Sequence, residues 1–278
     1  MEDFNFKKKF GQNFLTDKNL LNAIVNDAGV NEKSVVVEVG MGQGALTEQL
    51  VKKAKLVSGY EIDNELIDFL NDKFSTQKNL ILNFCDILSE SIEEVEKKVG
   101  NDYMVVANIP YYITTPIIFH FLENSNCKKL CLMIQKEVAE KIVAKEKTAN
   151  YGVLSVICQS FCSCNISRIV SKKMFRPMPK VDSAVIVLTV DEKYDKKFAK
   201  FIKSCFSMRR KTLVNNLSQG YNISKQDIGD FLTENNIVQT ARAEELTVEK
   251  FKQLFFAFTT KFDWISRFFL HKHKVFFI

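Results

Sequence analysis

One stretch of the sequence decides the fold, VVVEVGMGQG at residues 35–44. Its first half is rich in β-branched valines, which is typical of a buried parallel strand. Its three glycines are typical of a tight turn that leads into a helix. A strand, a glycine-rich turn and a helix form the first half of a βαβ unit. The stretch therefore predicts the α/β class, with a doubly wound parallel sheet.

The alternation of short apolar runs with helical patterns continues over about the first 190 residues. An early helix is predicted to end at Gly29, because glycine readily adopts the left-handed conformation of helix ends. After about Asp191 only helical spacing remains. We therefore expect a sheet domain over residues 1–191, a small all-helical C-terminal domain over 192–258 and a basic aromatic extension over 259–278. Further strands are expected at residues 56–61, 79–85, 104–107, 130–134 and 184–190.

Composition favours a compact protein of the cytoplasm. Hydrophobic residues make up 46% of the chain and charged residues 26%, with only 10 Gly and 4 Pro, which excludes disordered and collagen-like classes. Seven cysteines, an odd number without a leading signal segment, are expected to be free thiols in a reducing cytosol. Two uncharged stretches, 103–122 and 148–167, contain several polar residues, so neither is expected to span a membrane.

Charge is distributed unevenly along the chain. The whole chain carries a net charge of +6, but residues 31–102 hold eight basic and fourteen acidic residues, a balance of −6. Residues 193–215 hold eight basic residues and one acidic residue, a balance of +7. A polyanion would be repelled by the first region and attracted by the second. The basic region is either a nucleic-acid surface or a solvated helix face, and charge alone leaves both open.

The glycine turn and two acidic residues indicate a nucleoside-binding site. Gly40, Gly42 and Gly44 follow a G-x-G-x-G spacing, whereas a dinucleotide site needs G-x-G-x-x-G to hold a pyrophosphate. Glu61 ends the second predicted strand, where a carboxylate can accept hydrogen bonds from both ribose hydroxyls. Asp86, at the end of the third strand, could bind the adenine amino group or cap a helix. These features favour a cofactor without phosphate, such as S-adenosylmethionine, although the glycines alone could form a structural turn.

The segment Asn108-Ile109-Pro110-Tyr111, at the end of the fourth predicted strand, carries the strongest functional signal. An aromatic exocyclic amine is hard to methylate because its lone pair is delocalised into the ring, so a site must hold both amine protons. The Asn108 side-chain oxygen and the Ile109 carbonyl could accept them. Pro110 restricts the backbone, and Tyr111 offers a flat face on which an extruded base can stack. The pattern favours a catalytic amine clamp over a mere turn.

Motifs spread over the chain share the pattern of one protein family. They are FGQNFL (10–15), EVGMGQGALT (38–47), NIPYY (108–112), YGVLSV (151–156), FRPMPKVDSAV (175–185), FSMRRKTL (206–213) and RAEEL (242–246). From about residue 6 to residue 258 the chain closely resembles the KsgA family of bacterial small-subunit (16S) rRNA adenine dimethyltransferases. The resemblance implies a Rossmann-like class I methyltransferase sheet and S-adenosylmethionine as cofactor. The implied reaction is dimethylation at N6 of two adjacent adenosines in the 3′-terminal hairpin loop of 16S rRNA, with the small ribosomal subunit as partner.

The same resemblance implies roles for individual residues. The residues expected to line the cofactor site are Asn13, Leu15, Gly40, Glu61, Asp86 and Asn108. Those expected to hold the target base are Asn108, Tyr111 and Phe175. The cations expected to contact RNA are Arg176, Lys180, Arg209, Arg210 and Lys211.

Two departures from the family pattern stand out. Met41 occupies a position where family members usually carry Pro, which is expected to loosen the turn slightly without removing a ligand contact. Residues 259–278 have no counterpart in the family pattern.

Some residues invite a functional interpretation that their surroundings do not support. Cys158, Cys162 and Cys164 lack a nearby His and are expected to pack along an apolar helix, so no metal site is predicted. His120 stands between two phenylalanines and is interpreted as a packed helix residue rather than a catalytic base. The protein is expected to act as a monomer.

Two alternatives remain from the sequence. The first is a large-subunit rRNA adenine dimethylase of the Erm type, which shares the motifs of the front half; residues 209–213 and 242–246 argue against it. The second is a non-catalytic nucleic-acid-binding factor on the same fold. The complete amine clamp argues against that class, because a factor freed from catalysis has no need of it.

Overall fold

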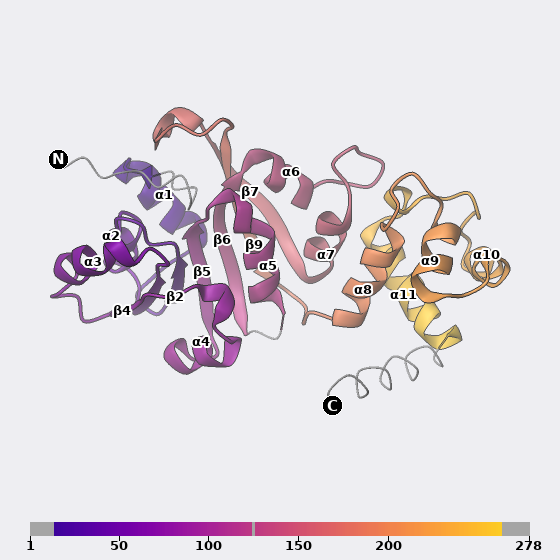
Figure 1. The fold of residues 1–278 in the computed structure, drawn as a ribbon, viewed down its shortest axis with the longest axis horizontal. Coiled ribbons are helices and arrows are strands. Elements are labelled where there is room, and N and C mark those ends of the chain that lie inside the picture. Colours follow the sequence, from indigo (N-terminus) through magenta and orange to yellow (C-terminus); the bar gives the residue numbers. More distant parts are fainter. Residues whose placement is uncertain (1–13, 124–125, 263–278) are drawn as a thin grey trace. The chain divides into compact units, whose positions relative to one another are not determined.

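The computed structural model describes residues 14–123 and 126–262, which form two compact units (Figure 1). The first unit takes its described residues from 14–140 and 161–194, and the second from 141–160 and 195–262. The segment 141–160 therefore groups with the C-terminal part of the chain, which the sequence pattern did not indicate. Most of the expected extension 259–278 lies outside the described residues. No described helix combines the length and apolar character needed to cross a membrane.

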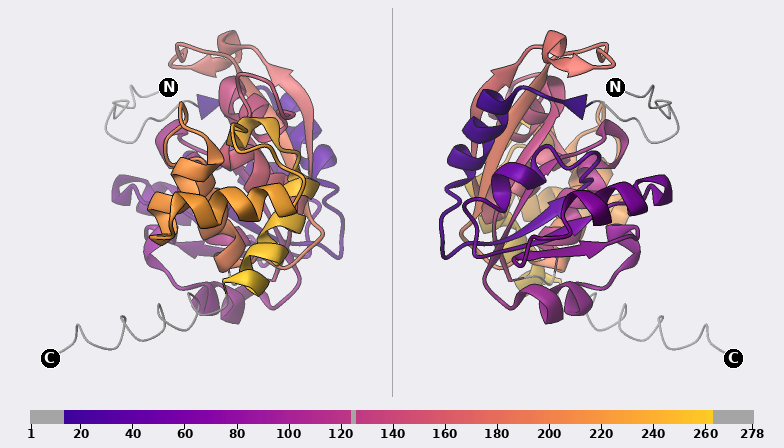
Figure 2. Two further views of the ribbon diagram at one scale, coloured as in Figure 1. Left: turned by 90° about the vertical axis from the view of Figure 1, so that its right-hand side faces the viewer. Right: turned by 90° about the vertical axis from the view of Figure 1, so that its left-hand side faces the viewer.

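A seven-stranded sheet forms the centre of the first unit (Figures 1 and 2). Its strand order is β4-β3-β2-β5-β6-β9-β7; the first five run parallel, and β9 and β7 are each antiparallel to their neighbours. The doubly wound α/β class is thereby confirmed. The strands are β2 (Val35–Val39), β3 (Leu56–Tyr60), β4 (Leu80–Asn83), β5 (Tyr103–Asn108), β6 (Cys127–Gln135), β7 (Cys162–Val170) and β9 (Ser183–Val190).

The strand β7 was not predicted, and its presence corrects one expectation. Cys162 and Cys164 lie on this strand rather than on a helix; only Cys158 lies on the helix before it. The strand is at the edge of the sheet and pairs only with β9. Its sequence, CSCNISRIV, mixes polar with apolar residues, in keeping with its partial burial. It therefore lacks the continuous apolar run that is typical of a central parallel strand.

Helices cover both faces of the sheet. In β5, Val106 packs in the same core as α1. The opposite face carries Tyr103, whose ring meets Phe121 of α5 at 6.4 Å between centroids. Because side chains alternate along a strand, α1 and α5 lie on opposite faces. The first unit also contains 3-10 turns at residues 64–66, 87–89, 111–113 and 172–174. Its helices are α1 (Lys18–Ala28), α2 (Thr47–Leu50), α3 (Ile67–Lys73), α4 (Ile92–Val99), α5 (Thr114–Leu122) and most of α6 (Lys136–Ile142).

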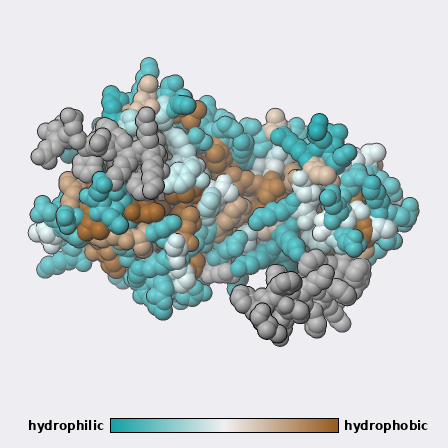
Figure 3. All heavy atoms as spheres, viewed as in Figure 1, coloured by the Kyte–Doolittle hydropathy of each residue, from teal (hydrophilic) through white to brown (hydrophobic). Residues whose placement is uncertain are grey.

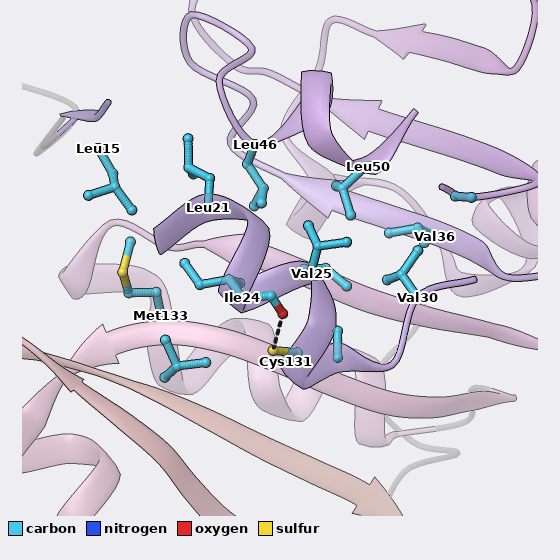
Figure 4. Close-up of a cluster of buried hydrophobic side chains, with 14 of the residues drawn as sticks. Leu15, Leu21, Ile24, Val25, Val30, Val36, Leu46, Leu50, Cys131 and Met133 are labelled. Carbon is cyan, nitrogen blue, oxygen red and sulfur yellow. Dashed lines mark hydrogen bonds between the residues drawn. The ribbon is translucent and has the colours of Figure 1, made fainter. Parts of the chain in front are cut away.

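The helix α1 contributes several side chains to one buried apolar core of the first unit (Figure 4). Its buried face, which includes Ile24 and Val25, packs against Leu46 just before α2, Leu50 at the end of α2 and Val36 of β2. The helix ends at Gly29, whose φ of 76° is left-handed, as predicted. This packing holds β2 and α2, the elements on either side of the glycine turn, against α1.

The second unit consists of helices around an aromatic core. The rings of Phe201, Phe231 and Phe258 meet at centroid distances of 5.2 and 5.7 Å. The segment 141–160 joins this unit through the Tyr151 hydroxyl, which donates to the Leu246 carbonyl over 2.9 Å. Hydrophilic residues cover much of this unit on the face drawn in Figure 3. Its helices are α7 (Val153–Phe161), α8 (Lys196–Cys205), α9 (Leu213–Tyr221), α10 (Lys225–Glu234) and α11 (Val248–Lys261), with a 3-10 turn at Ala243–Glu245.

Met41 fills a space that Gly59 of β3 leaves open. It is only 4% exposed and packs with Leu66, Leu70 and Phe74. A Cβ atom built on Gly59 would lie 2.2 Å from Met41 Sδ. The methionine is therefore part of the core that supports the glycine turn, and it requires a residue without a side chain at position 59.

We expect Gly59→Ala to destabilise the protein by about 1–3 kcal/mol through overpacking against Met41. Adding Met41→Pro should remove most of this penalty, because the obstructing side chain is then gone. Denaturant unfolding of the two single variants, the double variant and the unaltered chain measures the coupling. Strictly additive free energies would show that Met41 is not the obstacle.

Candidate cofactor and substrate site

A pocket lies at the carboxyl ends of the central parallel strands, within the first unit. It is lined by residues that follow β2, β3, β4 and β5, and by Leu15, Leu21 and Phe175 from further segments. Ligands of doubly wound proteins bind at the carboxyl ends of the strands. They bind near the point where successive strands begin to be added on the other side of the first strand, here between β2 and β5. The pocket contains five of the residues predicted to line the cofactor site, which are Leu15, Gly40, Glu61, Asp86 and Asn108. Asn13 lies outside the described residues.

The glycine turn after β2 brings the backbone close to the pocket. Gly40, Gly42 and Gly44 all have positive φ, at 74°, 53° and 75°, a region that other residues rarely adopt. A Cβ atom on Gly40 would stand 3.8 Å from the carbonyl oxygen of Asn108. The ends of β2 and β5 therefore lie close together at this side of the pocket.

Glu61 holds the turn and faces the pocket at once. Its Oε2 accepts a hydrogen bond from the Gly42 amide at 2.7 Å, and its Oε1 accepts from the amides of Ile62 and Asp63, each at 2.9 Å. Burial raises the pKa of Glu61, and these three amides partly oppose that effect. Each carboxylate oxygen has two acceptor sites, so Oε2 retains capacity for a ribose hydroxyl.

Asp86 caps a helical turn, one of the two roles that its position predicts, and it also lines the pocket. Its Oδ1 accepts from the Leu88 amide at 3.0 Å and so caps the 3-10 turn at Ile87–Ser89. The cap fixes the backbone after β4 with the carboxyl group at the pocket wall. The two interpretations are therefore compatible.

The predicted amine clamp lies beside the glycine turn, because β5 is the neighbour of β2 in the sheet. Asn108 is the last residue of β5, and the amide of Ile109 donates to the Met133 carbonyl at 3.2 Å, which holds the segment against β6. The Tyr111 hydroxyl lies 2.9 Å from Ser183 Oγ of β9. Burial raises the pKa of Tyr111, so its hydroxyl stays neutral. The ring is therefore held in place at the pocket wall.

Phe175 reaches the pocket through pairing with the N-terminal strand. β1 (Phe14–Leu15) and β8 (Phe175–Arg176) form a two-stranded antiparallel sheet in which Leu15 pairs with Phe175. Both residues are nearly fully buried, at 2% and 1% exposed, and both line the pocket. Only the family resemblance indicated Phe175 and Leu15.

The structure adds pocket residues to which sequence reasoning gave no role. Tyr112 is 61% exposed and lines the pocket beside Tyr111. Glu38 lines it from β2, is 1% exposed, and has an Oε2 atom without a hydrogen-bond partner among the described residues. Burial raises the pKa of Glu38 to about 8. Its position two residues before the first glycine was the only available signal.

The predicted RNA-contacting cations are all exposed, and they belong to different units. Arg176 and Lys180 lie in the first unit, where the Arg176 guanidinium donates to the carbonyls of Lys173 and Phe175. The other three, Arg209, Arg210 and Lys211, occupy a turn between α8 and α9 of the second unit. They follow α8, which ends at Cys205.

His120 lies on α5 as expected. Its ring meets Phe121 edge-on at 5.1 Å, and burial lowers its pKa. Among the described residues, no group of three or more His, Cys, Asp or Glu could hold a metal ion.

Comparisons with known proteins give a consistent result. A family model described as ribosomal RNA adenine dimethylase matches residues 3–260. A ribosomal RNA small subunit methyltransferase A from Enterococcus faecalis is 44% identical over 264 residues, which cover 90% of each chain. A dimethyladenosine transferase structure from Plasmodium falciparum has a TM-score of 0.73 at 25% identity and covers 89% of this chain and 98% of that one. The structure of the 23S rRNA methyltransferase ErmE has a TM-score of 0.67 at 26% identity, covering 88% and 99%.

Proposed function

The chain belongs to the ribosomal RNA adenine dimethylase family, and on this premise we propose that it dimethylates N6 of two adjacent adenosines in the 3′-terminal hairpin loop of 16S rRNA. It is an enzyme that uses S-adenosylmethionine. The observation that carries the proposal is one pocket that holds both the glycine turn with Glu61 and the Asn108-Ile109-Pro110-Tyr111 segment.

The choice of the small subunit rests on sequence identity. The relative from Enterococcus faecalis, whose name specifies the small subunit, is 44% identical to the chain. The 23S rRNA methyltransferase ErmE is 26% identical over a similar share of the chain. The motifs at residues 206–213 and 242–246 also match the small-subunit family pattern. We therefore favour 16S rRNA over the Erm-type alternative.

In the proposed reaction, the main contribution of the protein is to position the target amine next to the methyl group of the cofactor. S-adenosylmethionine supplies a methyl group bonded to a positively charged sulfur. The Asn108 side-chain oxygen and the Ile109 carbonyl accept hydrogen bonds from the two amine protons, in a geometry that favours a tetrahedral nitrogen. A strong base is unnecessary, because the methylated amine loses its proton readily. The rate then comes from holding the amine in line with the methyl group.

The target base must leave its stack to enter such a pocket. Tyr111 provides a face for the extruded base, and its bond to Ser183 fixes the ring before the base arrives. Phe175 closes the adjoining wall. Stacking on an aromatic ring is worth about 1–3 kcal/mol per base, which offsets part of the cost of unstacking.

The charge of the second unit supports RNA binding there. We expect joint replacement of Arg209, Arg210 and Lys211 by Ala to weaken small-subunit binding. The slope of log affinity against log salt should flatten by up to about 0.9 per lost phosphate contact. Cofactor affinity should not change, because every residue that lines the pocket belongs to the first unit. Binding titrations at several salt concentrations measure the slope.

A matched control removes the same charge from the acidic region. Lys33, Lys52 and Lys55 are exposed residues of the first unit, and their joint replacement by Ala should leave the slope unchanged. Because Arg209 also donates to the Ala149 carbonyl, the double variant Arg210→Ala with Lys211→Ala separates lost charge from lost structure. An unchanged slope in the triple variant would show that these cations form a solvated face.

The full proposal is tested by mapping methylation. Purified protein is incubated with labelled S-adenosylmethionine and small subunits that lack the modification, and the modified nucleotides are then located. We expect label on two adjacent adenosines of the 3′-terminal loop. Label on large subunits instead would favour the Erm-type activity, and no label on either would favour a non-catalytic factor.

We also propose that the enzyme acts as a monomer in the cytoplasm, where it meets its subunit. Every residue that lines the pocket belongs to the first unit, and the proposed mechanism assigns no role to a second copy. Light scattering at assay concentration tests this directly.

A further inference from the structure

The segment between β7 and β9, residues 171–182, projects beyond the ends of these two strands (Figures 1 and 2). We call it the projecting loop; it includes β8. Three of its large apolar side chains are exposed, those of Met174, Met178 and Val181, and Met178 is the most exposed at 58%. Isolated apolar residues are common on protein surfaces. Three within eight residues of one projecting loop favour contact with another molecule.

The projecting loop is also positively charged. It holds four basic residues, Lys172, Lys173, Arg176 and Lys180, and one acidic residue, Asp182, a balance of +3. The Asp182 carboxylate is engaged within the loop, because its Oδ1 accepts from the Lys172 amide at 2.9 Å. A surface that combines cations with apolar side chains suits RNA, whose phosphates attract the cations and whose bases offer apolar faces.

The projecting loop adjoins the pocket in which the target base is proposed to bind. Phe175 belongs to the loop and lines that pocket, and Ser183, the residue after the loop, bonds Tyr111. Three residue steps separate Phe175 from Met178, so their Cα atoms lie at most about 11 Å apart. Met178 is therefore within reach of nucleotides next to a base that Phe175 holds. Because RNA must lie beside the loop whenever a base occupies the pocket, RNA is favoured over a lipid surface as its partner.

Extrusion of the target adenosine leaves a gap between the bases on either side of it. Unstacking costs free energy, and proteins that separate neighbouring bases often insert an apolar side chain, Met among them, into the gap. Met178 stands between Arg176 and Lys180 in the sequence, and all three side chains are exposed. A methionine side chain is unbranched and flexible, so it can fill a gap of irregular shape.

We propose that Met178 inserts into the base stack of the rRNA hairpin loop and fills the position that the extruded adenosine leaves. Arg176 and Lys180 then contact the phosphates on either side of the gap. The inference rests on the proposed rRNA substrate. It adds a contact outside the pocket, to the nucleotides beside the one being methylated, and it involves no covalent step.

The first test maps this contact on small subunits that lack the modification. Met178 is replaced by the photoreactive residue p-benzoylphenylalanine, and S-adenosylhomocysteine is added in place of the methyl donor. After irradiation, the crosslinked nucleotides of 16S rRNA are located by primer extension. We expect crosslinks immediately next to the target adenosines. Phe69, an exposed apolar residue of α3, is the control position and should give no crosslink there.

The second test measures the effect of Met178 on the reaction. We expect Met178→Ala to slow single-turnover methylation at saturating subunits and cofactor by about tenfold, because the extruded state is less populated without the inserted side chain. Cofactor affinity should not change, because Met178 does not line the pocket. Met178→Leu keeps an apolar side chain of similar volume and should retain most of the rate.

A matched control removes the same side chain from another position of the projecting loop. Met174→Ala should reduce the rate by less than about twofold, because the proposal places only Met178 in the gap. Equal losses in Met174→Ala and Met178→Ala would show a diffuse contact and overturn the assignment. Thermal unfolding of each variant reports on the fold.

The mapping experiment can also overturn the proposal. Crosslinks from position 178 only to distant rRNA segments, only to a ribosomal protein or to no part of the subunit would do so. Mapping measures contact rather than rate, so it decides the matter even if Met178→Ala does not fold. Failure of the unaltered protein to methylate small subunits would overturn the proposed function and this inference together. Normal methylation by the unaltered protein with a negative mapping result would overturn this inference alone.

Discussion

Replacing Asn108 with Ala is expected to lower the rate of methyl transfer by about 100- to 1,000-fold. Loss of one preorganised polar contact in comparable sites costs about 3–4 kcal/mol of transition-state stabilisation. The backbone hydrogen bonds that place the segment do not involve this side chain; the Ile109 amide still donates to Met133. Fold and RNA affinity should therefore persist. Single-turnover methylation of small subunits, with thermal unfolding as a check on the fold, measures the effect.

A conservative variant separates the lost acceptor from lost shape. Asn108→Asp keeps an acceptor oxygen at the same position and should retain more activity than Asn108→Ala. If Asn108→Ala turned over at a near-normal rate, the amine clamp would have to be assigned to other groups of the segment. If both variants failed to bind RNA, the residue would have a structural rather than a chemical role.

Replacing Glu61 with Ala should strongly weaken the binding of S-adenosylmethionine. A charge-assisted hydrogen bond contributes about 1.5–3 kcal/mol, and Glu61 is assigned two hydroxyl partners. The dissociation constant should therefore rise at least about tenfold, and more than a hundredfold if both contacts are lost at full strength. Calorimetric titration with S-adenosylmethionine measures this. RNA affinity in the absence of cofactor should be unchanged.

The same carboxylate supports the glycine turn, so its structural role must be separated from its binding role. Glu61→Ala removes the acceptor for the Gly42, Ile62 and Asp63 amides. Glu61→Gln retains one acceptor oxygen and should keep more of the turn while losing the charge. Unchanged cofactor affinity in both variants would contradict the ribose role.

The sequence predicted the parts of the site that are local in the chain. The valine-rich strand, the glycine turn and the clamp each consist of neighbouring residues, and the carboxyl ends of parallel strands meet at one edge. Gly40, Glu61, Asp86 and Asn108 therefore came together as expected. In each case backbone conformation and residue type carry the information.

Features that depend on distant pairing could not be predicted in this way. The short strands β1 and β8 contain two residues each and lack a periodic pattern, so the contact of Leu15 with Phe175 had no signal outside the family resemblance. In the sequence, Glu38 is one polar residue within a predicted strand. That it is buried and lines the pocket is known only from the structure. The edge strand β7 was missed because its partial burial dilutes the apolar pattern.

The grouping of residues 141–160 with the C-terminal helices limits how the protein can be divided or recombined. A fragment that begins near residue 192 would lack α7 and the hydroxyl of Tyr151 that holds Leu246. The side-chain amide of Gln159, which donates to the carbonyls of Ile142 and Ala144, would be missing as well. A chimaera that exchanges the second unit with that of a relative must therefore transfer two separate pieces of the gene, because a single junction would leave each parent's helices without their native partner.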